Sequence, residues 1–207
     1  CAHAFDGPAY RGFDASTLSA EDLAFSQTHI RILCGLYGVL RPLDAIKPYR
    51  LEMGCKLEND VGKNLYGFWG ESITEAIAED LASQPPDQRF VVNCASQEYF
   101  KSVRPELLTN QGIEVYNCVF PGPSVHAKQA RGAMCRHVVL NRVLTPEGLK
   151  SFTGSGGEWR FDERQSKGND FVFVRGVAGA GGAGVGTTKK AGATKKAEAT
   201  KKTGATK

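Results

Sequence analysis

Long apolar runs are missing from this sequence, which excludes a chain that crosses a membrane as a helix. A transmembrane helix needs about 20 consecutive apolar residues, and no stretch of the 207 residues approaches that length. The opening residues 1–6 also lack the basic and apolar segments of a secretory signal. Because the chain begins with Cys1 rather than Met, we expect it to be a fragment of a longer protein.

The sequence also lacks the short motifs of common catalytic and metal-binding sites. There is no Cys-x-x-Cys pair, no Cys/His pair at zinc-finger spacing, no Gly-x-Gly-x-x-Gly, no Walker loop and no His-Glu-x-x-His. We therefore expect neither a metal nor a cofactor. The six Cys do not make a disulfide scaffold in a chain of this size. A reducing compartment is expected, which favours the cytosol.

Charge is unevenly divided between residues 1–175, the body, and residues 176–207, the tail. The whole chain has a formal net charge of +4, but the tail holds seven Lys and one Glu. The body then carries 19 basic and 21 acidic side chains, a net charge of −2. The tail has no aromatic residue and repeats a Thr-Lys-Lys unit at 188–193, 194–199 and 200–205. This composition predicts a disordered segment.

The Lys-Lys pairs of the tail suit contact with nucleic-acid phosphates. On this reading, deletion of the tail weakens nucleic-acid binding and flattens its salt dependence. The alternatives are a solubilising tail, an artefact of gene prediction or a retained targeting sequence. The last of these keeps the nucleus or an organelle open as the compartment.

Hydrophobic patterning predicts a single domain over the body. Ser19, followed by acids and an apolar run, predicts a capped helix that ends near Leu33. Apolar residues at four-residue steps predict a second helix at about 71–82, and a third is expected at about 125–143 with Ser124 as its cap. β-Branched runs predict strands at 89–94, 113–120, 158–161 and 171–175, the last two as a hairpin. Together these elements predict an α/β fold, or α+β, with helices flanking a central sheet.

Residues 35–54 are rich in glycine, aromatic and basic residues. Gly35 and Gly38 would let a phosphate approach backbone N–H groups, and Arg41 and Arg50 follow. One interpretation is a helix-hairpin-helix, whose glycine-containing hairpin offers its amides to DNA phosphates. The other is a helix end followed by a proline-rich loop, because the glycine spacing is Gly-x-x-Gly rather than Gly-x-Gly.

The expected third helix carries a second group of cations. Lys128, Arg131 and Arg142 share one face, because their spacing returns to nearly the same angle. Gly132 is unfavourable inside a helix, which indicates close packing or close approach of a ligand. The cationic face favours phosphate contacts; the alternative is a solvated face with salt bridges. We predict that one concave surface gathers Arg41, Arg50, Lys128, Arg131 and Arg142.

A third stretch, residues 95–101, follows an expected buried strand, at the end where α/β sheets bind ligands. Ser96 lies outside a Gly-x-Ser-x-Gly elbow, so it suits a helix N-cap better than a nucleophile. If the protein is an enzyme, the catalytic candidates are Glu98, Ser96 and Glu52. Lys101 is a further candidate for phosphate contact.

Several ordered segments resemble the YaaA peroxide-stress protein family: 36–44 (LYGVLRPLD), 48–54 (PYRLEMG), 65–70 (LYGFWG), 95–101 (ASQEYFK) and 128–134 (KQARGAM), with Asn141 and Arg142 beyond. The resemblance runs from about residue 4 to residue 175. It implies a cytosolic protein that protects cells from hydrogen peroxide, in part by limiting unincorporated iron. It also implies a compact α/β fold, DNA binding, a positively charged cleft and a helix-hairpin-helix-like element.

The sequence departs from this family at both ends. The family's N-terminal portion, with its Ser-Pro-Ala-Lys strand, is absent, so we expect any cleft built partly from that strand to be incomplete. The Lys-rich tail is not a family feature.

Two functions are open at this point. The preferred one is DNA binding through phosphate contacts at Gly35, Gly38, Arg41, Arg50, Lys101, Lys128, Arg131 and Arg142. The alternative is an enzyme that acts on an anionic metabolite or nucleotide in a mixed-charge pocket. A continuous positive groove favours the first, and one deep pocket favours the second. Direct iron binding is a weaker option, because no His/carboxylate cluster has ligand spacing.

Overall fold

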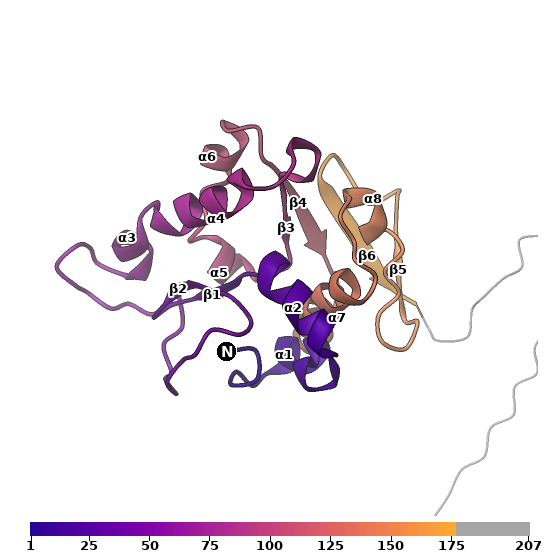
Figure 1. The fold of residues 1–207 in the computed structure, drawn as a ribbon, viewed down its shortest axis with the longest axis horizontal. Helices are drawn as coiled ribbons and strands as arrows, with labels where there is room; N and C mark the ends of the chain where they lie inside the picture. The colour runs from indigo at the N-terminus through magenta and orange to yellow at the C-terminus, as the bar shows by residue number, and fades with distance from the viewer. Residues whose placement is uncertain (177–207) are drawn as a thin grey trace, which may run out of the picture.

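The computed structural model describes residues 1–176, which fold around a four-stranded sheet (Figure 1). The strands lie in the order β3, β4, β6 and β5, with the bounds Phe90–Asn93, Glu114–Val119, Asp170–Arg175 and Trp159–Phe161. Strands β3, β4 and β6 run parallel, and β5 pairs antiparallel with β6. The fold is therefore mixed α/β, as predicted. The predicted disorder of the tail falls on 177–207, outside the described residues.

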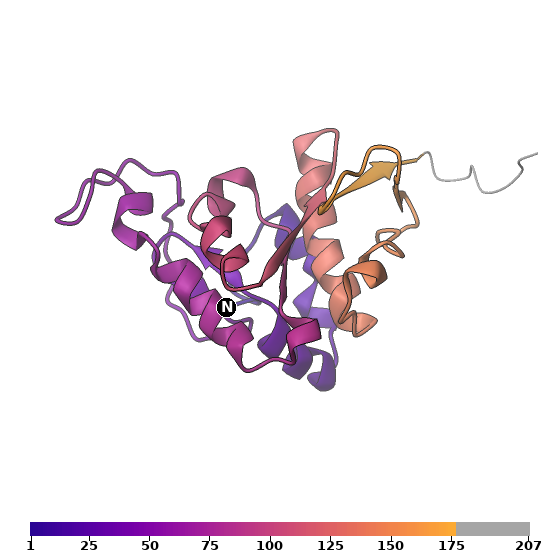
Figure 2. The ribbon, with the colours of Figure 1, turned by 90° about the horizontal axis from the view of Figure 1, so that it is seen from above.

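The sheet separates two hydrophobic cores, because successive side chains of a strand point to opposite faces. On β4, Val115 belongs to one core and Cys118 to the other. On β3, Val91 and Val92 divide in the same way. Figure 2 shows helices on both sides of the strands.

Helix α7 (Ser124–Leu140) and the short α8 (Pro146–Leu149) cover the Cys118 face. The Val115 face is covered by α3, α4, α5 and α6, with the bounds Leu65–Trp69, Ser72–Ala82, Gln97–Phe100 and Pro105–Thr109. Single turns of 3-10 helix occupy Ala15–Thr17 and Pro86–Gln88. No helix within residues 1–176 combines the length and hydrophobicity needed to cross a membrane.

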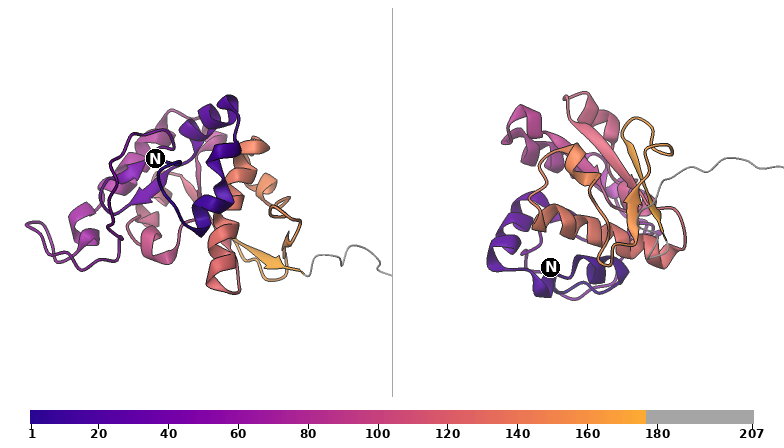
Figure 3. Two further views of the ribbon diagram at one scale, coloured as in Figure 1. Left: turned by 90° about the horizontal axis from the view of Figure 1, so that it is seen from below. Right: turned by 90° about the vertical axis from the view of Figure 1, so that its right-hand side faces the viewer.

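Helix α1 (Pro8–Phe13) packs directly against α7 (Figure 3). Two glycines make this crossing close: a Cβ atom at Gly132 would lie 1.7 Å from the carbonyl oxygen of Ala9, and one at Gly12 would lie 2.1 Å from that of Gln129. The close-packing interpretation of Gly132 is therefore confirmed. Helix α2 (Ala20–His29) follows α1 and contacts the other end of α7.

A ladder of polar side chains joins the three parallel strands. The amide of Asn93 donates to Asn117 at 2.9 Å, and the amide of Asn117 donates to Asp170 at 2.7 Å. These residues are register partners on β3, β4 and β6. The ladder therefore marks the same level of the sheet on all three strands.

Several local predictions are confirmed. Ser19 caps α2 through a reciprocal capping box with Asp22. The second predicted helix is α4, and the closing hairpin is the β5–β6 pair. Ser96 caps α5 by accepting a hydrogen bond from the N–H of Tyr99.

Residues 30–40 differ from both interpretations of this stretch. Helix α2 ends at His29, and β1 (Ile32–Cys34) and β2 (Gly38–Leu40) form an antiparallel hairpin. The helix-hairpin-helix prediction is therefore wrong. Gly38 supports the hairpin turn by its φ of 73°, a conformation that favours glycine.

The predicted cap of the third helix is also wrong. Ser124 is the first residue of α7, Pro123 occupies the N-cap position, and no side chain caps the helix.

Candidate functional site

A cavity of about 640 Å³ runs along the outer edge of β3, and we call it the β3 cavity. Its walls come from α1, α7, the start of α5 and the loop at 49–52. Residues Asn93 and Cys94 place the carboxyl end of β3 in this wall, and ligands of open α/β sheets bind at that end. Its volume lies within the range of about 300–1,000 Å³ typical of small-molecule sites.

Three predicted cations meet at this cavity. Arg50 comes from the loop after the β1–β2 hairpin, and Lys128 and Arg131 come from successive turns of α7. Arg50 has the carboxylate of Glu52 at 3.8 Å, but the Arg50 side chain is 92% exposed, so this ion pair contributes little. Lys128 is exposed and makes no ion pair within residues 1–176.

Arg131 is the most unusual of these cations. Its Nε is shielded from solvent and has no hydrogen-bond partner, and it is the one such side-chain nitrogen or oxygen in the described part of the chain. No carboxylate of residues 1–176 lies within ion-pair distance of it. A buried donor without an acceptor destabilises the fold, more so when it is charged. The arrangement suits a ligand that brings an anionic oxygen.

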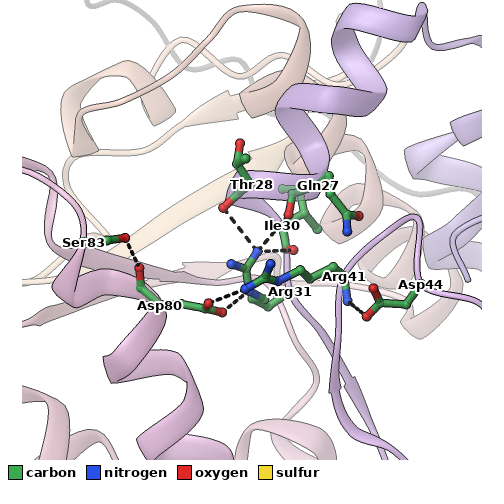
Figure 4. A network of polar contacts seen from close by, with 8 residues as sticks. All are labelled: Gln27, Thr28, Ile30, Arg31, Arg41, Asp44, Asp80 and Ser83. Carbon is green, nitrogen blue, oxygen red and sulfur yellow. Dashed lines mark hydrogen bonds and ion pairs between the residues drawn. The ribbon is translucent and has the colours of Figure 1, made fainter.

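Arg41 does not line the cavity; it belongs to a group of polar contacts that we call the Asp80 network (Figure 4), whose Arg31 and Asp80 do line it. The guanidinium of Arg41 donates to Asp80 at 2.6 Å, and Arg31 donates to the other carboxylate oxygen at 2.5 Å. The backbone N–H of Arg41 also donates to Asp44 at 2.7 Å. This network joins the hairpin to α4.

Asp80 is held in its charged form by the two arginines. Burial alone would raise the pKa of this carboxyl, but the hydrogen bonds and charges of Arg31 and Arg41 outweigh burial and lower the pKa below its ordinary value. Arg41 therefore makes an ion pair within the chain, although its side chain is 48% exposed.

Arg142 is paired in a similar way. It lies just beyond α7, where it donates to Asp22 at 2.8 Å and stacks over Phe25 with its guanidinium carbon 4.6 Å from the ring centre. It thus fastens the end of α7 to α2. Arg41 and Arg142 do not line the β3 cavity, so one concave surface for all five cations stays a prediction.

Gly35 and Gly38 are explained by packing. A Cβ atom at Gly35 would lie 2.7 Å from the carbonyl oxygen of Leu51, and one at Gly38 would lie 2.9 Å from the ring of Trp69. The indole N–H of Trp69 donates to the carbonyl oxygen of Gly35 at 3.0 Å. Phosphate contact at these glycines stays a prediction.

The three catalytic candidates do not share one site. Ser96 and Glu52 line the β3 cavity, and Glu98 does not. The carboxylate of Glu98 accepts a hydrogen bond from the N–H of Gly54 at 2.9 Å, and its carbonyl accepts one from the hydroxyl of Tyr66 at 2.9 Å. Glu98 thus anchors the loop that carries Glu52.

Lys101 also lies outside the cavity. Its Nζ is 4.9 Å from the centre of the Tyr66 ring, a cation–π contact beside the loop that Glu98 anchors. Its predicted phosphate contact would therefore be separate from those of Arg50, Lys128 and Arg131.

Three tyrosines form part of the cavity that sequence reasoning did not assign. Tyr10, Tyr49 and Tyr99 line it from α1, the 49–52 loop and α5. Burial raises the pKa of each hydroxyl, and the Cys34 thiol, 2.5 Å from the Tyr49 hydroxyl, raises the pKa of Tyr49 further. All three therefore stay protonated at neutral pH. The sequence offered one indication of this role, the position of Tyr49 next to Arg50. Nothing near Tyr10 in the sequence indicates that it reaches the cavity.

The thiols of Cys94 and Cys135, which line the cavity, stay protonated at neutral pH. The contact with Cys118 and burial raise the pKa of Cys94 well above its usual value, and the contact with Cys94 and burial do the same for Cys135. A protonated thiol is a poor nucleophile and a poor metal ligand. Residues 1–176 contain no group of three or more His, Cys, Asp or Glu side chains arranged to hold a metal ion.

Comparison with known proteins gives a consistent result. Residues 1–165 match the family described as peroxide stress protein YaaA. The UPF0246 protein Bxeno_A1262 of Paraburkholderia xenovorans is 49% identical over 180 residues, which cover 84% of this chain and 68% of the relative. The UPF0246 protein BTH_I1090 of Burkholderia thailandensis is 49% identical over 177 residues, which cover 83% of this chain and 67% of the relative.

Proposed function

Because this chain belongs to the peroxide stress protein YaaA family, we propose that it protects cells from hydrogen peroxide by binding DNA through phosphate contacts. The supporting observation is that Arg50, Lys128 and Arg131, from two distant stretches, meet at the β3 cavity. Within residues 1–176, Lys128 and Arg131 have no carboxylate at ion-pair distance, and Arg50 has only the exposed Glu52 at 3.8 Å. The proposed compartment is the cytosol.

The proposed interface is local, because the body as a whole has a net charge of −2. Arg50 and Lys128 are exposed and can reach phosphates of a duplex, whereas Arg131 lies deeper. Arg41 and Arg142 leave the proposed set, since both are held in ion pairs. Lys101 and the tail are additional, separate contacts in this proposal.

The same contacts account for the proposed effect on iron. DNA phosphates hold a condensed layer of counterions, and cationic side chains release those counterions when they bind. Unincorporated iron held at the phosphates would be released with them. Damage from that iron would fall without a metal site in the protein.

The test is the salt dependence of DNA binding. In the full chain, Arg50→Ala with Lys128→Ala should weaken binding to all sequences alike and lower the slope of log K against log salt by about two contacts. Arg164→Ala is the matched control, because Arg164 is exposed and outside the cavity. An unchanged slope in the double variant would refute this interface.

A second candidate function has support from one observation. Glu52 and Ser96 line the same cavity as the cations, which is the mixed-charge pocket expected of an enzyme that acts on an anionic metabolite or nucleotide. Glu52→Gln separates the two functions, because a carboxylate repels phosphates. A DNA-binding protein should bind as well or slightly better, whereas an enzyme that uses Glu52 as an acid or base should lose roughly 10²–10⁴ in rate. Survival of peroxide-treated cells carrying this variant measures the difference.

A further inference from the structure

The shielded Nε of Arg131 needs an acceptor that the described residues do not supply. Three carboxylates line the same cavity, those of Asp6, Glu52 and Asp80, and each is paired with an arginine other than Arg131. The cavity lining also offers donors to an anion, among them the Lys128 ammonium and the hydroxyls of Tyr10 and Tyr99. Charge complementarity therefore calls for an anion at this end.

The rest of the β3 cavity is largely aromatic and apolar, and an anion does not match it. Its wall is formed by the rings of Tyr10, Tyr49 and Tyr99 and by apolar side chains such as Phe5, Ile77 and Val92. An inorganic anion alone would leave this wall without a partner. A flat, largely apolar group attached to the anion would bury it, and aromatic side chains bind such groups by stacking.

We propose that the β3 cavity is a nucleotide site, in which Arg131 binds the phosphate and the tyrosine-lined wall takes the base. This inference rests on the proposed function and deepens it, because it states that a single nucleotide is the part of the nucleic acid that enters the β3 cavity. A stacked duplex is too wide for a cavity of about 640 Å³, whereas a single unstacked nucleotide fits within it. Two sources offer this chemistry: one nucleotide of a single strand, or a free nucleotide.

The first experiment asks whether the cavity recognises a base as well as a phosphate. Calorimetric titration of the full chain compares dAMP with 2-deoxyribose 5-phosphate, which has the same sugar and phosphate without the base. We expect dAMP to bind about 10-fold more tightly. Arg131→Ala should weaken both by about 10- to 100-fold, and Arg131→Lys should weaken both less, because it keeps the charge. Arg164→Ala should change neither.

The second experiment separates the two sources of the nucleotide. Binding of a single-stranded oligonucleotide and of its duplex is measured by anisotropy for the unaltered chain and for Arg131→Ala. We expect a preference for the single strand that Arg131→Ala removes, while duplex binding through Arg50 and Lys128 persists. Circular dichroism spectra that match the unaltered chain establish that each variant is folded.

The outcomes distinguish this inference from the proposed function. Equal binding of dAMP and 2-deoxyribose 5-phosphate, or affinities untouched by Arg131→Ala and Arg131→Lys, would overturn the nucleotide site, and duplex binding could still stand. Binding of dAMP through Arg131 without binding of either oligonucleotide would support the site for free nucleotides and overturn the proposed function.

Discussion

In the Asp80 network, Arg31 and Arg41 share one carboxylate, whereas at the β3 cavity the Nε of Arg131 has no partner in residues 1–176. The side chains are chemically identical, and Arg41 and Arg131 both come from stretches rich in basic residues. They differ in the partners that the fold supplies: α4 brings the carboxylate of Asp80 to Arg31 and Arg41, whereas within residues 1–176 no carboxylate lies at ion-pair distance from Arg131. A basic side chain therefore indicates an anion-binding site only when no carboxylate of the protein already pairs with it.

The largest effect is expected from a change that disturbs the packing of α1 against α7, the helix that carries Arg131. Gly132→Ala would place a Cβ 1.7 Å from the carbonyl oxygen of Ala9, so α1 must separate from α7. We expect a loss of about 3 kcal/mol or more in the free energy of unfolding, despite the better helix propensity of Ala. Urea titration measures it.

Gly156→Ala is the matched control for this change. Its new Cβ would meet the flexible end of Glu158 at 3.2 Å, and the expected change is within about 0.5 kcal/mol. Equal stability of the two glycine variants would show that the α1–α7 crossing does not depend on Gly132.

Removing the shared carboxylate should have a smaller effect. Asp80→Asn leaves Arg31 and Arg41 without their anionic partner, and the free energy of unfolding should fall by about 1.5–3 kcal/mol. Glu75→Gln, at an exposed position on the same helix, should have almost no effect. DNA binding should be unchanged in both variants; a loss of binding in Asp80→Asn would contradict the division into paired and unpaired arginines.

The same carboxylate should give the network a pH dependence. The pKa of Asp80 is lowered in the folded state, so its stabilising effect is complete above its ordinary value of 3.8 and is lost as the pH falls through the lowered value. The difference in unfolding free energy between the unaltered chain and Asp80→Asn should therefore shrink below about pH 4. A difference that is the same at pH 7 and pH 2.5 would exclude this origin.

The smallest effect on stability is expected at single arginines. Arg142→Ala removes the contacts with Asp22 and Phe25, and should lower Tm by only a few degrees while DNA binding is unchanged. Arg50→Ala should do the opposite, because its side chain is 92% exposed: Tm stays constant and binding weakens. Thermal melts and DNA-binding titrations of both variants measure these changes. Equal changes in Tm and in affinity for the two variants would contradict the distinction between Arg142 and Arg50.

Features set by neighbouring residues could be predicted from the sequence. The capping box of Ser19, the apolar face of α4 and the β5–β6 hairpin depend on spacings of a few residues. Strands β1 and β2 were missed because three residues are too short to show a period of two. The helical pattern before them was extended instead.

Contacts between residues far apart in the chain could not be predicted from the sequence either. Arg41 meets Asp80 39 residues later, and nothing near Arg41 in the sequence indicates that carboxylate. Tyr10 reaches the cavity because the glycines of α1 and α7 allow the two helices to approach. Arg50, Lys128 and Arg131 could be proposed from sequence, since each lies in a basic stretch, but their meeting place depends on the tertiary fold.

The ladder of Asn93, Asn117 and Asp170 also bears on how the sheet assembles. Its two hydrogen bonds join residues 24 and 53 positions apart, so each forms only after a long loop has closed. If a strand pairs one residue out of register, its polar side chain points to the opposite face of the sheet and cannot form its hydrogen bond in the ladder. Pairings that are one residue out of register therefore lack these two hydrogen bonds, so the ladder favours the native alignment of the three strands.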